Sequence, residues 1–98
     1  MIQIKSELSK VLGKIEELDH SSLTSGNLYP LIERAYLLIS DSFDIEQCHS
    51  TIHHLVMCMK ELKDYDKSEN KSSAEEEKIL NNARLICAEE LRIFISHL

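Results

Sequence analysis

The sequence predicts an all-α protein: one domain, residues 1–98, folded as a single small bundle of four antiparallel helices. Only two glycines and one proline are present, so few tight turns are available, and Leu, Glu and Lys, which favour helices, are abundant. Apolar residues recur every three or four positions, as on one side of a helix. Because short joints favour antiparallel neighbours, the helices are expected at about residues 2–19, 29–40, 45–65 and 74–97.

The first helix has a regular apolar stripe opposite its charged residues. Gly13 interrupts this helix at a cost in helix stability, and we expect it to let another helix pack closely. Residues 19–27 then concentrate Ser, Thr, Asn and one glycine, which indicates a loop. The stripe consists of Ile2, Ile4, Leu8, Val11, Leu12, Ile15 and Leu18.

The second helix contains the only proline of the chain. Pro30 suits the first turn of a helix, where its missing N–H costs no hydrogen bond, and this places the cap near Asn27 or Leu28. Tyr36 and Leu37 widen the apolar face beyond a single stripe. Such a wide face indicates a central helix.

The third helix follows Asp44, which together with Gln47 three residues later matches a capping box. Its helical spacing continues as far as Tyr65. The segment 66–73, DKSENKSS, contains no apolar residue, so burial cannot offset the entropy lost on ordering it. We therefore expect a mobile polar loop at 66–73.

The fourth helix is expected behind a second capping box, in which Ser72 pairs with Glu75 or Ser73 pairs with Glu76. Acids in a first helical turn are also favoured by the helix dipole. A broad apolar seam indicates that this helix packs along most of the bundle. The seam consists of Leu80, Ala83, Cys87, Leu91, Phe94 and Leu98.

The charge balance restricts the class of partner. Seventeen acidic residues against 11 basic residues give a formal net charge of -6, which disfavours nucleic acid and anionic lipid and suits a basic protein surface. No apolar run is long enough to span a membrane, and the first residues lack a secretory signal, so we expect a cytoplasmic protein. The cysteines form neither an even disulfide set nor a CxxC knuckle, which fits buried thiols in a reducing compartment: Cys48, Cys58 and Cys87.

The histidines are the main candidates for chemistry. His49 and His53 stand four residues apart on one helix face, a spacing that can bind a metal ion. Zinc needs further ligands, however, and Ser50 stands where an HExxH motif has glutamate, so both side chains can equally be boundary histidines. Cys48 and His49 point about 100° apart and do not form a catalytic pair. With no glycine-rich phosphate loop, the sequence predicts a binding protein that is not an enzyme and needs no cofactor.

The acidic joint between the third and fourth helices has two interpretations. Seven acids accompany three lysines between residues 61 and 77. They can form a solvated helix end with cap-favouring carboxylates. Alternatively, they can form a docking surface for a basic partner, with Tyr65 as an amphipathic anchor. The predicted contact residues are Glu61, Asp64, Tyr65, Asp66 and Glu69.

Residues 39–86 resemble small helical immunity proteins of bacterial type VI secretion effectors, those that neutralise an NAD(P)-hydrolysing toxin. The matching features are a D-S-F-D turn, a Lys-Glu-apolar run followed by acids, and a final helix with a leucine and a small residue. The residues concerned are Asp41, Ser42, Phe43 and Asp44; Lys60, Glu61, Leu62, Asp64 and Asp66; and Leu80 and Ala83. The resemblance implies a non-catalytic helical body that caps a cognate toxin and blocks its active site.

Two functions therefore follow from the sequence. The first is an immunity protein whose acidic surface enters the basic cleft of a toxin, with Tyr65, Tyr36 or Tyr29 at the apolar centre of the contact. The alternative is a secretion chaperone or adaptor that binds a partner helix in an apolar groove, for which the wide face through Tyr36 and Leu37 is suited. The sequence does not fix the oligomeric state.

Overall fold

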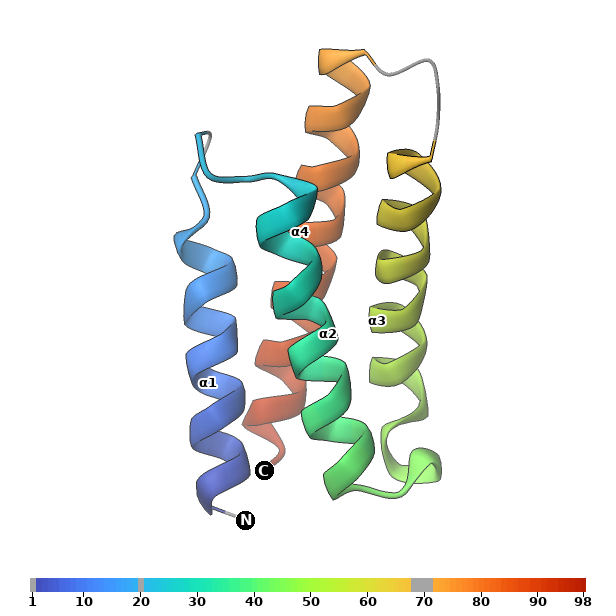
Figure 1. Ribbon diagram of the computed structural model, residues 1–98. Helices are drawn as coiled ribbons and strands as arrows, with labels where there is room; N and C mark the ends of the chain where they lie inside the picture. The colour runs from blue at the N-terminus through green and yellow to red at the C-terminus, as the bar shows by residue number, and fades with distance from the viewer. Residues whose placement is uncertain (1, 20, 68–71) are drawn as a thin grey trace.

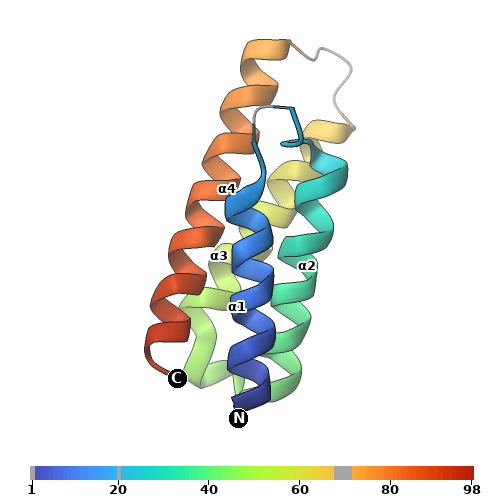
Figure 2. The same cartoon turned by 90° about the vertical axis from the view of Figure 1, so that its left-hand side faces the viewer.

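The computed structural model describes residues 2–19, 21–67 and 72–98, and in these ranges the chain forms four α-helices and no strand. Each helix runs antiparallel to the next, and the four pack into one elongated bundle of 43 × 25 × 17 Å (Figures 1 and 2). This arrangement confirms the predicted all-α bundle. The helices are α1 (Ile2–Glu17), α2 (Ser25–Ser42), α3 (Ile45–Asp66) and α4 (Ser73–Ser96).

One continuous hydrophobic core runs along the bundle, and every helix contributes to it. Burying a single leucine or isoleucine side chain stabilises a fold by about 1.5–3 kcal/mol, so these residues dominate the stability of the bundle. Each helix packs against its two neighbours in the order α1, α2, α3, α4. The large side chains that are fully buried are Leu8, Ile15, Leu28, Ile32, Ile39, Leu55, Leu62 and Leu91.

The start of α2 differs from the prediction. The Oγ1 atom of Thr24 accepts a hydrogen bond from the backbone N–H of Asn27 at 3.1 Å, so Thr24 is the N-cap and the helix begins at Ser25. Pro30 consequently lies inside the helix, where it cannot donate to the carbonyl of Gly26. Gly26 is exposed near the helix end, and water can hydrogen-bond to its carbonyl.

The start of α3 was predicted correctly in position but not in mechanism. Asp44 is the N-cap, yet its side chain makes no capping hydrogen bond. One turn later, Cys48 departs from helical geometry with φ -127° and ψ 20°, and its thiol donates to the carbonyl of Asp44 at 3.3 Å. The first turn of α3 is therefore set apart from the rest of the helix, as Figure 1 shows.

The start of α4 confirms one of the two predicted caps. The Ser72 hydroxyl oxygen accepts a hydrogen bond from the N–H of Glu75 at 3.2 Å. The joint before it is shorter than the predicted loop 66–73, because Asp66 still belongs to α3 and Ser73 already belongs to α4. Residues 68–71 lie outside the described residues.

The role predicted for Gly13 is wrong. A Cβ atom placed on Gly13 would meet no heavy atom of another element within 4 Å, so no helix packs closely there. The start of α1 and the end of α4 lie at one end of the bundle, and the start of α2, the end of α3 and the start of α4 lie at the other (Figures 1 and 2). None of the helices in the described ranges has the length and apolar composition needed to cross a bilayer.

Candidate partner-binding surface

The predicted contact residues lie where α3 ends and α4 begins. Glu61, Asp64 and Asp66 are exposed there, whereas Glu69 is outside the described residues. The carboxylate of Asp66 accepts a hydrogen bond from the Ser25 hydroxyl at 2.8 Å. Asp66 therefore connects the end of α3 to the start of α2, and of the described acids among the predicted contact residues, Glu61 and Asp64 remain available to a partner.

Tyr65 does not have the exposed position expected of an anchor. Its side chain is only 9% exposed, and its hydroxyl donates to the carbonyl of Ser72 at 3.2 Å. Burial raises the pKa of Tyr65, and the nearby carboxylates of Glu76, Glu75 and Asp66 raise it further. Tyr65 therefore holds the end of α3 against the start of α4.

Two lysines and two acids lie close together along the last turns of α3. Lys60 and Lys63 stand three residues apart on the side that faces α2. Glu61 and Asp64 are also three residues apart: Glu61 is turned about 100° from Lys60, whereas Asp64, four residues after Lys60, is turned only about 40° from it. The acidic surface therefore borders Lys60 at Asp64, and Glu61 is turned further from the α2 side.

An apolar groove runs between α2 and α3. It has a volume of about 610 Å³, and two of its aliphatic side chains are open to solvent, Leu37 at 43% and Val56 at 39%. Tyr36 and Leu37, which form the wide face predicted for the second helix, line its α2 side. The complete lining is Tyr29, Glu33, Tyr36, Leu37, Val56, Met59, Lys60 and Lys63.

A smaller hollow joins this groove to the acidic end. It has a volume of about 270 Å³ and is lined by Ser25, Gly26, Tyr29 and Pro30 of α2 together with Lys63 and Asp66. Tyr29 belongs to both depressions, and the Lys63 ammonium lies 5.6 Å from the centre of its ring, a cation–π distance. Tyr29 is therefore the aromatic side chain that lies beside the acidic end and is accessible from it.

A third hollow, of about 430 Å³, lies between the α1–α2 loop and α4 and contains Arg84. The Arg84 guanidinium donates to the Leu18 carbonyl and to the Asn81 side-chain oxygen, both at 3.3 Å. Its Nε atom is buried without a hydrogen-bond partner among the described residues. On the rim, hydrogen bonds from the Ser21 hydroxyl and from Ser22 lower the pKa of Asp19 to about 2.

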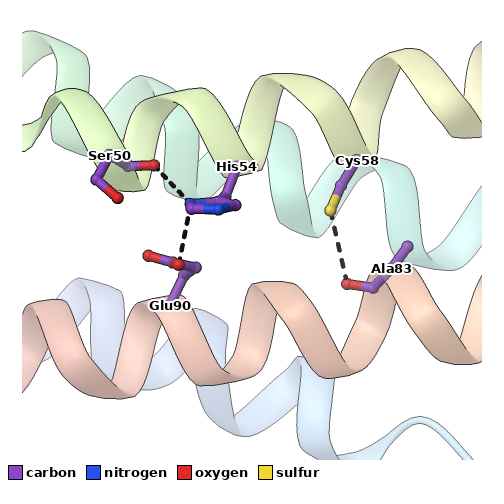
Figure 3. A network of polar contacts seen from close by, with 5 residues as sticks. All are labelled: Ser50, His54, Cys58, Ala83 and Glu90. Carbon is purple, nitrogen blue, oxygen red and sulfur yellow. Dashed lines mark hydrogen bonds and ion pairs between the residues drawn. The ribbon is translucent and has the colours of Figure 1, made fainter.

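The two histidines proposed as metal ligands stack on each other. The rings of His49 and His53 are nearly parallel, with centres 6.4 Å apart. Over the ranges that the structure describes, no three His, Cys, Asp or Glu side chains gather where they could hold a metal ion. His54 instead faces α4, where its Nδ1 atom lies 2.8 Å from the Ser50 carbonyl and 3.0 Å from the Glu90 carboxylate (Figure 3).

The three cysteines are buried free thiols. Cys58 on α3 and Cys87 on α4 interact across the core: the hydrogen bond between their thiols lowers the pKa of Cys58 and raises that of Cys87, which burial raises further. The Cys58 thiol also points to the Ala83 carbonyl at 4.0 Å (Figure 3). Cys48 is buried beside an exposed His49, and burial followed by the charge of Asp44 raises its pKa. A raised pKa keeps this thiol protonated and poorly nucleophilic.

Fold and surface together define a small four-helix bundle with an acidic end and an apolar groove beside it. No model of a known protein family, no curated protein and no solved structure matches this chain.

Proposed function

We propose that the protein is an immunity-type inhibitor, which binds a secreted toxin domain in the cytoplasm and blocks its active site with the acidic end of the bundle. The main support is the exposure of Glu61 and Asp64, which form no ion pair with any described residue. Glu75 and Glu76 lie across the joint in the first turn of α4. A toxin cleft that binds an anionic substrate is positively charged, so these carboxylates would steer the two proteins together.

Tight inhibition also needs an apolar centre in the contact. Tyr65 is buried in the bundle, but Tyr29 is half-buried in the hollow that ends at Asp66. An aromatic ring with a polar tip, partly exposed beside charged groups, is typical of residues that contribute strongly to interfaces. Tyr29 therefore takes the role that the sequence assigned first to Tyr65.

The experiment is co-expression with secreted toxin domains of the NAD(P)-hydrolysing class, to find one that the wild-type chain neutralises. We expect Glu61→Lys/Asp64→Lys to abolish rescue of the cells, because four units of charge change at the contact. The matched control is Asp41→Lys/Glu46→Lys, which changes two exposed acids by the same total charge near the opposite end of the bundle. Full rescue by the first variant, or equal loss with both, would exclude the acidic end from inhibition.

The groove between α2 and α3 supports a second candidate, an adaptor or secretion chaperone that binds a partner helix. The two candidates respond to different substitutions. An adaptor would lose its partner with Leu37→Asp, which places a charge in the groove, and would keep it with Glu61→Lys/Asp64→Lys. The inhibitor would show the reverse pattern in the rescue assay.

A further inference from the structure

The groove between α2 and α3 has two walls of opposite charge. Glu33 lines the α2 side, and Lys60 and Lys63 line the α3 side. Within the described part of the chain, none of these three side chains forms an ion pair. The floor between the walls is apolar, with Leu37 and Val56 the most exposed of its aliphatic side chains.

Positions along the groove follow from the antiparallel packing of α2 and α3. Tyr29 and Lys63 lie against each other at one end of the groove, 5.6 Å from ring centre to ammonium. Glu33 is four residues after Tyr29, and Lys60 is three residues before Lys63, so they lie about 6 Å and about 4.5 Å further along the groove at a rise of 1.5 Å per residue. Glu33 and Lys60 therefore stand at the same level on opposite walls.

We propose that this face binds a second copy of the chain in a two-fold symmetric dimer, with the symmetry axis lying along the groove. A rotation of 180° about that axis keeps each residue at the same height along the groove. It places the α2 wall of one copy opposite the α3 wall of the other copy. Glu33 of each copy then faces Lys60 of the other copy, and this ion pair occurs twice. At the other end of the groove, Leu37 of each copy meets Val56 of the other copy, so the ion pairs stand between this apolar contact and the end at Tyr29.

Because the groove carries a negative charge on one wall and positive charges on the other, it favours a second copy of the chain over an unrelated partner. A partner helix with a single dominant charge would be attracted to one wall and repelled by the other, whereas the groove is complementary to itself. Its short apolar floor resembles a small, transient interface, so we expect a dissociation constant on the order of 10 μM. Glu61 and Asp64 do not line the groove, so the dimer does not depend on the proposed inhibition, but it covers Tyr29, and a toxin that contacts Tyr29 would compete with the second copy.

The test combines two charge-reversed variants, Glu33→Lys and Lys60→Glu. Sedimentation equilibrium from about 1 μM to 1 mM should show a dimer for the wild-type chain and about tenfold or greater weakening for each variant alone, because both symmetric pairs become repulsive. An equimolar mixture should dimerise again. In that heterodimer the two substituted positions face each other with opposite charges, and the unchanged Glu33 of one variant faces the unchanged Lys60 of the other.

Two control variants have the same net charges as the two test variants, but their substitutions lie outside the groove. Glu46→Lys and Lys10→Glu are exposed, and both should dimerise like the wild-type chain. Circular dichroism of all variants checks that the bundle is folded. A wild-type chain that stays monomeric over this range would overturn the proposal, as would a mixture that stays monomeric or single variants that dimerise as tightly as the wild-type chain.

Discussion

Replacing Gly13 by alanine should stabilise the protein. Gly13 lies inside α1, its φ is not positive, and a Cβ atom at this position meets nothing within 4 Å. Alanine can therefore adopt the native backbone without strain, while the unfolded chain loses the additional freedom of glycine. Glycine inside a helix costs about 0.5–1 kcal/mol relative to alanine, so Gly13→Ala should raise the free energy of unfolding by that amount.

Thermal unfolding followed by circular dichroism measures this effect. For a domain of this size the gain corresponds to a rise in Tm of about 2–8 °C. The control is Lys10→Ala, an exposed position of the same helix, where two good helix formers differ by less than about 0.5 kcal/mol. An unchanged or lower Tm for Gly13→Ala would show that glycine is needed at this position and would refute the reasoning.

Three further predictions concern stability. Thr24→Ala removes the cap of α2 and should cost about 1 kcal/mol in chemical unfolding, whereas Thr24→Ser should restore most of it. Leu91→Ala leaves a cavity in the fully buried core and should cost about 2–5 kcal/mol, whereas the exposed Leu85→Ala should stay within about 0.5 kcal/mol in the same urea titrations. The pKa of Asp19 is lowered from its ordinary value of 3.8 to about 2 in the folded protein. The charged carboxylate therefore stabilises the fold fully above pH 3.8, and this contribution is lost as the pH falls through 2. Urea midpoints measured across that window should therefore fall less in Asp19→Asn than in the wild-type chain.

The existence and order of the helices could be predicted because the signal is local. Apolar residues spaced three and four apart identify a buried helix face without knowledge of its neighbours. The same spacing extends from Leu55, Cys58 and Leu62 to Tyr65, which is buried. Tyr65 was assigned to the surface because its hydroxyl suits an interface, although its position in the stripe already indicated the core.

Helix ends were harder to predict because several capping signals compete. Pro30 suggested a late start for α2, but the hydrogen bond from Asn27 to Thr24 begins the helix earlier, and the proline is tolerated near its exposed end. Asp44 has the sequence of a cap and makes no capping hydrogen bond, since α3 changes direction at Cys48. Such outcomes depend on packing that a local motif does not contain.

The candidate surface was predictable only in part. The acids Glu61 and Asp64 were located from charge along the chain, but a count of charges does not show that Lys60 and Lys63 line a groove against α2 and that the two acids do not. The pairing of His54 with Glu90 on a different helix depends on the tertiary fold, and the sequence contains no local sign of it.

Because all three cysteines are buried, their reaction with an alkylating agent can be used to measure opening motions of the bundle. A thiol shielded by the core can be alkylated only when the protein opens, so the alkylation rate reports how often that part of the structure separates. Cys48 lies at the bend near the start of α3, whereas Cys58 and Cys87 lie between α3 and α4. Mass spectrometry after brief alkylation would thus distinguish fraying of one helix end from separation of two helices. The native cysteines suffice, so no cysteine has to be introduced by mutation.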